Sequence, residues 1–280
     1  MGTIVVTTDQ SANSSAAIRF AIYLAKERKA SLVILHVYHV LKPLIWSDNA
    51  YQVYKLSLLQ QIRHETTLFI KKIIKSMNLT EVDFQLVLTA HKDVTEGILQ
   101  FTADSPCDYL CISTRGAGKV AKLFGTHTSK LILHAKVPVI CIPSAHRKKE
   151  CSSVLYASDM TDYKAELLKV VDFAKPLHAK LMLLHLNYKN EATLDKDLME
   201  ASIEKQLNYE VAVINSKRNT LNTLIQDICM EAKRLDPSVI AFFTHQSRSF
   251  LEKILLPSNA AEYSFYGRIP FISYRAESHD

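Results

Sequence analysis

A repeat inside the chain constrains the fold more than any other feature of the sequence. Residues 4–9 form an apolar run that ends in an aspartate, and residues 153–159 form a second such run, so that Asp9 and Asp159 lie 150 positions apart. A proline followed by apolar residues also recurs, at Pro138 and Pro270. Solenoid repeats have periods of only about 20 to 50 residues. The sequence therefore predicts a duplicated domain.

Each copy carries a pattern of alternating strands and helices. In the first copy, the β-branched run at residues 4–6 predicts a buried strand, residues 12–29 have apolar positions at helical spacing, and residues 31–37 predict the next strand. A strand, a helix and a strand in this order form a right-handed parallel unit. Further elements of this copy are expected at residues 50–77 (helix), 82–88 (strand), 94–103 (helix), 108–112 (strand) and 137–140 (strand).

The repeat predicts two α/β domains, residues 1–146 and residues 151–280, joined by a polar segment at residues 146–150. A chain of 280 residues has the length expected for two domains of about 100–150 residues each. A ligand of an open parallel sheet binds beyond the carboxyl ends of the strands. We therefore expect Asp9 and the backbone around Val37 to lie at a ligand-binding edge.

Residues 113–143 combine the end of a strand, several glycines and the start of a helix. Gly116 and Gly118 follow the strand, and Gly125 precedes Thr126 and Thr128, either of which could cap the free N–H groups of the next helix. Small residues at a helix N-terminus favour phosphate, because the backbone N–H groups and the helix dipole both attract an anion. Alternatively, the glycines serve only to turn the chain sharply.

Two other glycine motifs fit this region less well. Residues 116–121 imitate the dinucleotide fingerprint GxGxxG/A, but that motif requires an acidic residue about 20 positions further on, where residues 135–137 offer none. The chain contains no GxxxxGK[ST] sequence, which argues against a P-loop.

The same stretch resembles the nucleotide-binding signature of the universal stress protein family. That signature is Gly, two residues, Gly, nine residues, Gly, and then Ser or Thr, followed by a helix and a Pro-Val strand. Gly116, Gly125 and Thr126 match the second Gly, the third Gly and the hydroxyl, and residues 137–140 match the strand. Two departures concern the nucleotide site: Ser113 replaces the first Gly, and only eight residues separate Gly116 from Gly125.

The resemblance covers nearly the whole chain as two tandem copies. It implies two open five-stranded parallel sheets with helices on both faces, a Rossmann-like fold of the adenine nucleotide alpha hydrolase type. It also implies dimers that meet through the last strand. Two copies in one chain could form this pair internally, with a further homodimer and an unidentified protein partner left open.

The resemblance also implies ATP or a related adenine nucleotide as the ligand of the first domain. Asp9 would approach the ribose or a phosphate-bound Mg²⁺, although it could instead be a polar turn residue. Ser113 could block the backbone or bond to a phosphate, and Thr126 could be a plain helix cap. The residues placed around the nucleotide are Asp9, Val37 (through its backbone), Ser113, Gly116, Gly125, Thr126 and Thr128.

The second copy lacks the residues that such a site requires. Between Val239 and Tyr266 no glycine remains, and Pro257 stands in the region that matches Gly125. Bulky side chains would crowd a phosphate, and proline removes an N–H donor. Asp159 is retained, which suits a turn or a helix cap. We expect a degenerate site in the second domain.

Composition argues against several other classes of protein. The net charge is +6, but Lys and Arg are spread over predicted helices, which favours solvated faces over nucleic-acid binding. The five cysteines form no CxxC pair, as expected for a cytoplasmic protein. The start of the chain reads as a strand, so no signal peptide is expected. No apolar run reaches the ~18–20 residues of a membrane span.

No catalytic or metal site emerges from the sequence. The eleven histidines form no HExxH motif, and no serine lies in a GxSxG elbow. Three functions remain open: a nucleotide-binding regulator in a stress response, a structural or partner-binding module with no working nucleotide site, and a slow ATPase. Enzyme activity beyond a weak ATPase is not expected.

Overall fold

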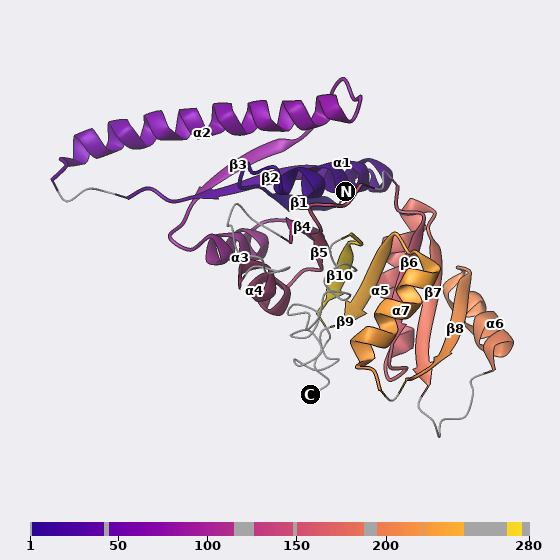
Figure 1. The fold of residues 1–280 in the computed structure, drawn as a ribbon. Coiled ribbons are helices and arrows are strands. Elements are labelled where there is room, and N and C mark those ends of the chain that lie inside the picture. The colour runs from indigo at the N-terminus through magenta and orange to yellow at the C-terminus, as the bar shows by residue number, and fades with distance from the viewer. Residues whose placement is uncertain are drawn as a thin grey trace.

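The computed structural model describes residues 2–41, 45–114, 126–147, 150–187, 195–219, 221–243 and 268–275. In this part of the chain the strands form one ten-stranded sheet with the order β3-β2-β1-β4-β5-β10-β9-β6-β7-β8. The first half of the sheet comes from the first copy of the repeat and the second half from the second copy (Figure 1). The α/β fold predicted from the repeat is therefore confirmed.

The first half is an open parallel sheet of five strands. β1 pairs with β2 and β4, β2 also pairs with β3, and β4 also pairs with β5, all in parallel. Its elements are β1 (Thr3–Thr7), α1 (Ser14–Arg28), β2 (Ser31–Tyr38), α2 (Asp48–Ser76), β3 (Gln85–Ala90), α3 (Val94–Asp104), β4 (Tyr109–Ser113), α4 (Thr126–His134) and β5 (Val139–Ile142).

One predicted strand is shifted. The segment expected at residues 82–88 pairs only from Gln85 onward and continues to Ala90. Val82 and Phe84 pack against the hydrophobic core without joining the ladder. Apolar and polar residues alternate here as they do in a strand, because a segment that packs against a core needs apolar side chains at the same positions as a paired strand does.

The second half repeats this topology. β6 pairs with β7 and β9, β7 also pairs with β8, and β9 also pairs with β10, again in parallel. Its elements are β6 (Ser153–Ser158), α5 (Tyr163–Ala174), the 3-10 helix η1 (Lys175–Leu177), β7 (Lys180–Asn187), α6 (Lys196–Leu207), β8 (Val211–Lys217), α7 (Leu224–Leu235), β9 (Val239–Phe243) and β10 (Phe271–Tyr274).

The two halves join through their last strands. β5 and β10 run antiparallel, and Ile140 pairs with Ile272 at the centre of the ladder. Cys141 pairs with Phe271 and Val139 with Ser273, so the register is symmetric about that centre. An unpaired edge strand is an aggregation hazard, and this pairing covers one edge in each half. The internal pairing expected from the sequence is confirmed.

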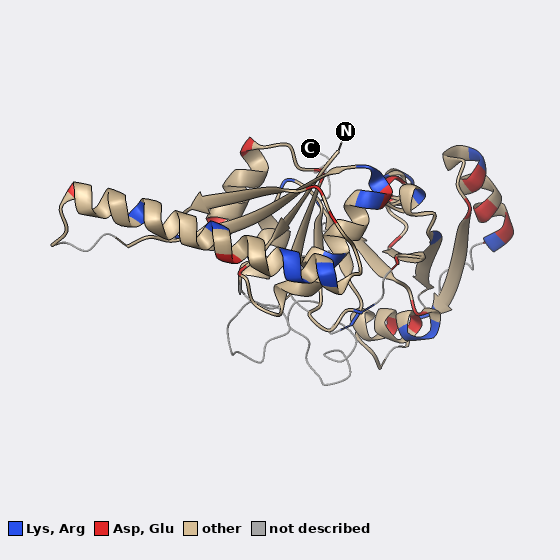
Figure 2. Cartoon of the chain, turned by 90° about the horizontal axis from the view of Figure 1, so that it is seen from above, with Lys and Arg blue, Asp and Glu red and all other residues tan. Residues whose placement is uncertain are grey.

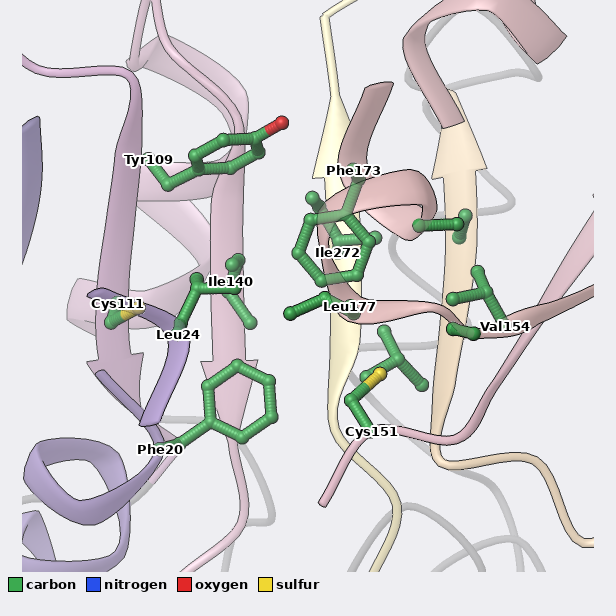
Figure 3. Close-up of a cluster of buried hydrophobic side chains, with 14 of the residues drawn as sticks. Phe20, Leu24, Tyr109, Cys111, Ile140, Cys151, Val154, Phe173, Leu177 and Ile272 are labelled. Atoms are coloured by element: carbon green, nitrogen blue, oxygen red, sulfur yellow. The ribbon is translucent and has the colours of Figure 1, made fainter. Parts of the chain in front are cut away.

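Both faces of the sheet are covered by helices. Buried side chains of α1, α2, α5 and α6 share one core with the strands, and those of α3, α4 and α7 share the other. Figure 3 shows how the first core crosses the joint: Leu24 of α1 and Ile140 lie opposite Phe173, Leu177 and Ile272. A fully buried side chain of this size contributes about 1.5–3 kcal/mol, so the shared core stabilises the two halves as one unit.

Helix α2 is the longest helix described and extends well beyond the edge of the sheet (Figures 1 and 2). Its buried residues, Thr66, Ile70, Ile73 and Ile74, all lie in its C-terminal half. Lys and Arg alternate with Asp and Glu over the helices in Figure 2. This distribution is typical of solvated helix faces.

Candidate functional site

The carboxyl ends of β1, β2 and β4 meet at one edge of the first half. Thr7 pairs with Leu35 and Val6 with Cys111. Asp9, Val37 and Ser113 each follow one of these paired residues by two positions, so the register places all three at the same edge. A parallel sheet of this kind binds its ligands there.

Asp9 lies in a tight turn directly after β1. Its Oδ1 accepts hydrogen bonds from the backbone N–H of Ser11 at 3.0 Å and from the Ser11 hydroxyl at 2.6 Å. Gln10 has a φ of 61°, and its N–H donates to the Thr8 hydroxyl oxygen at 3.0 Å. Asp9 therefore has the role of a polar turn residue, one of the two roles that the sequence left open. Its exposed side chain remains accessible from the sheet edge.

The backbone of β2 runs past the end of β1 at Val37. The ladder between β1 and β2 ends at the pair Thr7–Leu35, while β2 continues to pair with β3 as far as Tyr38. The side chain of Val37 is buried and packs against Gly97 of α3, where an added Cβ would lie 2.9 Å from Val37 Cγ1. The peptide groups near Val37 are thus held on a rigid strand, which suits backbone recognition of a flat ring.

The hydroxyl of Ser113 donates a hydrogen bond to the carbonyl oxygen of Asn13 at 3.0 Å. This contact links the end of β4 to the start of α1. In the structure, the serine that replaces the first signature glycine therefore has a partner within the protein. A phosphate at this edge would compete with Asn13 for that hydroxyl.

Helix α4 (from Thr126) connects β4 to β5, and because these strands are parallel, its N-terminal end lies on the side of their carboxyl ends. Thr128 lies within the first turn and is buried, so it is not the cap residue that precedes the helix. Gly116, Gly125 and the side chain of Thr126 lie outside the described residues. The roles expected for Gly116, Gly125 and Thr126 in phosphate binding therefore stay predictions.

Thr95 and His127, which the sequence did not indicate as site residues, hold α3 and α4 together near this edge. His127 Nδ1 lies 2.6 Å from the hydroxyl oxygen of Thr95. Asp93 caps α3 and accepts the N–H groups of Thr95 and Glu96, as its position before the helix predicts. The hydrogen bond from Glu96 is the main cause of a lowered pKa of the Asp93 carboxyl. No local pattern marks His127, because its partner is 32 residues away.

The turn after β1 recurs after β6 in the second half. Asp159 Oδ1 accepts the N–H of Thr161 at 2.9 Å. Met160 has a φ of 68° and donates its N–H to the Ser158 hydroxyl oxygen at 3.0 Å. The aspartate turn is therefore the same in both halves. Residues 244–267, where the sequence predicts loss of the phosphate loop, lie outside the described residues.

The comparisons with known proteins agree with this architecture. A sequence model of the universal stress protein family matches residues 1–143. The chain belongs to the universal stress protein family. None of the curated proteins compared with this universal stress protein matches it.

Solved universal stress proteins share the fold over nearly the full length of the chain. One from Archaeoglobus fulgidus DSM 4304 is 19% identical, with a TM-score of 0.69, and the match covers 99% of this chain and 97% of that chain. One from Pseudomonas aeruginosa UCBPP-PA14, described as a putative universal stress protein, is 14% identical, with a TM-score of 0.54 and coverage of 98% and 92%. The tandem fold thus has counterparts among experimental structures.

Two further observations concern the described part of this universal stress protein. No helix there is both long and apolar enough to cross a membrane. Among the same residues, no three His, Cys, Asp or Glu side chains gather in a group that could hold a metal ion.

Proposed function

We propose that this universal stress protein binds ATP or a related adenine nucleotide in its first half and acts as a regulatory protein in a stress response. The observation that carries the proposal is the convergence of Asp9, the free end of the β1–β2 ladder at Val37 and the start of α4 at one sheet edge. The N-terminus of α4 supplies the dipole and N–H groups that favour a phosphate.

Each group has a role in this proposal. The exposed carboxylate of Asp9 accepts hydrogen bonds from the ribose hydroxyls or contacts Mg²⁺ on the phosphates. The backbone of β2 at Val37 holds the adenine. Gly125 allows the phosphates to approach the start of α4, and Thr126 adds its hydroxyl. The nucleotide is a ligand here, and no residue is assigned a catalytic step.

A second function is supported by a specific contact. Ser113 stands where the signature has glycine, and its hydroxyl already donates to Asn13, so the side chain adds bulk at this edge without a free donor for a phosphate. With the shortened spacing between Gly116 and Gly125, this favours a partner-binding module in which the nucleotide site has decayed.

The matched aspartates provide the decisive test. Asp9→Ala and Asp159→Ala both remove the hydrogen bond from the backbone N–H two residues further on, and Asp9→Ala also removes the one from the Ser11 hydroxyl. Unfolding of the two variants, measured alongside, separates this structural cost from an effect on binding. Calorimetric titration with MgATP should show binding to the parent protein and to Asp159→Ala, and binding weakened about tenfold or more in Asp9→Ala. Gly125→Val should abolish binding by blocking the phosphates.

Absence of binding to the parent protein would favour the partner-binding module. Phosphate release above the buffer rate, lost in Asp9→Ala, would instead identify a slow ATPase.

A further inference from the structure

A cavity lies away from the carboxyl edge of the sheet. It has a volume of about 760 Å³ and lies between α1, the residues that follow α2 and the segment that joins the two halves. Small-molecule sites typically have volumes of about 300–1,000 Å³. None of the seven residues predicted to hold the nucleotide is among its lining residues. The cavity is therefore distinct from the proposed nucleotide site.

Two arginines face this cavity from different elements. Arg19 is a partly buried residue of α1, and Arg147 is an exposed residue of the joining segment at the cavity's edge. The Arg147 guanidinium donates to the carbonyl oxygens of Ser144 at 2.7 Å and His146 at 2.8 Å, which fixes its position. Among the residues that the structure describes, no carboxylate forms an ion pair with Arg19. Burial, and next the charge of Arg147, lower the pKa of Arg19.

Two guanidinium groups that form no ion pair among the described residues and share a partly enclosed space attract an anion. Arginine is well suited to this task because its planar fork binds carboxylate, sulfonate or phosphate oxygens in pairs. An anion between Arg19 and Arg147 would also remove the repulsion that each feels from the other.

Half of the remaining lining residues are apolar or aromatic. Phe20 and Leu177 are buried side chains that line the cavity. Figure 3 shows that they come from opposite halves of the protein. The Phe20 ring meets the His146 ring edge to face, with the ring centres 5.9 Å apart. Tyr23 lies one helical turn after Arg19, and its hydroxyl accepts the N–H of Cys151 at 3.1 Å. These groups would cover the apolar body of a ligand.

Two carboxylates limit the charge that the cavity accepts. Glu27 and Glu150 also line it, and their charges contribute to the raised pKa of Tyr23, which is caused mainly by burial. With Lys26 as a third cation beside the two arginines, the lining carries one positive charge more than it has negative ones. A ligand with several negative groups would be repelled at that side. The lining therefore favours one anionic group joined to an apolar body.

We infer that this cavity is a binding site for a small amphipathic organic anion. Arg19 and Arg147 hold the charged head group, and Phe20, Tyr23 and Leu177 cover the body. Because the lining comes from both halves and from the segment between them, a bound ligand would also stabilise the joint.

The probe for the test is 8-anilino-1-naphthalenesulfonate, which carries one sulfonate on an aromatic body and fluoresces when bound. The uncharged N-phenyl-1-naphthylamine has the same rings without the sulfonate. The parent protein should bind the sulfonate probe. Arg19→Gln should weaken that binding about tenfold, the effect expected for one charge-assisted hydrogen bond, and should leave the uncharged probe nearly unaffected. Arg19→Lys, which retains the charge, should recover part of the affinity.

Arg63→Gln is the matched control, because it removes the same charge from an exposed position on α2. It should leave the affinity for the sulfonate probe unchanged. Equal weakening by Arg63→Gln, or no weakening by Arg19→Gln in protein with unchanged circular dichroism, would overturn the inference. Excess ATP should not displace the probe, since the two sites are separate. Displacement by ATP would also overturn it, whereas failure of ATP to bind at all would affect only the proposed function.

Discussion

The guanidinium of Arg28 lies 3.0 Å from the carboxylate of Asp172, so an ion pair joins the last turn of α1 to α5 in the other half of the chain. Arg28 also donates to the backbone carbonyl oxygens of Asp172 at 2.7 Å and Phe173 at 3.3 Å. Its guanidinium lies 4.8 Å from the centre of the Tyr109 ring, and the Tyr109 hydroxyl donates to the same carboxylate. Two residues of the first half, Arg28 and Tyr109, thus hold the end of α5, and Arg28 supplies most of the contacts.

We expect Arg28→Ala to lower the free energy of unfolding by about 1–3 kcal/mol, because it leaves acceptors of α5 without their donor. The Arg28 side chain is only 14% exposed, whereas that of Asp172 is 69% exposed. Asp172→Asn should therefore cost at most about 1 kcal/mol, the range of exposed ion pairs. Urea unfolding of the two variants compares these values. Equal losses would show that the ion pair, and not the backbone contacts, secures the joint.

The sequence predicts the fold to a large extent, because burial and periodicity are local signals. Alternating strands and helices are visible within windows of ten to twenty residues, and the repeat of Pro138 at Pro270 predicts which strands meet. The contact from Ser113 to Asn13 and the pair Arg28–Asp172 span 100 and 144 positions. Contacts at such distances leave no pattern in a single sequence, since many polar residues could supply either partner.

The site is less predictable than the fold for the same reason. Asp9 and Val37 are placed at the expected edge because strand order alone determines that edge. Their local environments are decided by partners elsewhere: Ser11 for the carboxylate of Asp9, and Gly97 for the side chain of Val37. A motif identifies the residue types that a ligand needs, but it does not reveal which of them the protein already uses for its own structure.

A buried carboxyl in the second half should make stability depend on pH. Glu166 of α5 is almost fully buried and accepts a hydrogen bond from the Tyr156 hydroxyl. Burial raises the pKa of Glu166 to about 7, while the nearby Lys169 partly opposes the shift. The folded state therefore retains this proton over a range in which the unfolded chain loses it. The contribution of Glu166 is fully present below about pH 4.5 and is lost as the pH rises toward 7.

Glu166→Gln should consequently gain stability relative to the parent protein between pH 4.5 and pH 7, reaching a difference on the order of 1–3 kcal/mol. Urea unfolding at a series of pH values measures this difference. Glu204→Gln, which changes an exposed carboxylate on α6, serves as the control and should show no comparable trend. A constant offset between Glu166→Gln and the parent protein would contradict the buried-proton explanation.

The connection between β8 and α7 is organised by a buried ion pair. Arg218 Nε lies 3.0 Å from Asp227 Oδ2, and the two side chains are 13% and 6% exposed. The Asp227 carboxylate also accepts the N–H of Asn219 at 3.1 Å and the side-chain amide of Asn222 at 2.8 Å. Removing one partner of such a pair leaves a buried charge uncompensated, which costs about 3–5 kcal/mol.

We therefore expect Asp227→Ala to destabilise the protein by about 3–5 kcal/mol. The control is Arg234→Ala on the same helix, which removes the ion pair with Glu231 through a side chain that is 61% exposed. That change should cost about 1 kcal/mol or less for the ion pair. Thermal unfolding followed by circular dichroism compares the two. A similar loss from both variants would mean that helix α7, and not the buried pair, determines the effect.

The last prediction concerns Gly97, which connects packing to the proposed nucleotide site. A Cβ at this position would lie 2.8 Å from His91 Cβ and 2.9 Å from Val37 Cγ1, which is closer than side-chain carbons normally approach. Gly97→Ala must therefore displace β2 or α3, at a cost of about 1–3 kcal/mol for overpacking.

Because Val37 lies on the stretch of β2 proposed to hold adenine, the displacement should weaken nucleotide binding although Gly97 contacts no ligand in the proposal. Gly2→Ala is the control: its Cβ would meet Asp108 Oδ2, which accepts the N–H of Thr3, at 2.9 Å. This packing cost falls at the opposite end of the strands. Titration of both variants with MgATP should show weaker binding in Gly97→Ala alone. Unchanged affinity in a destabilised Gly97→Ala protein would separate the packing of Val37 from adenine recognition and would move the proposed adenine contact away from β2.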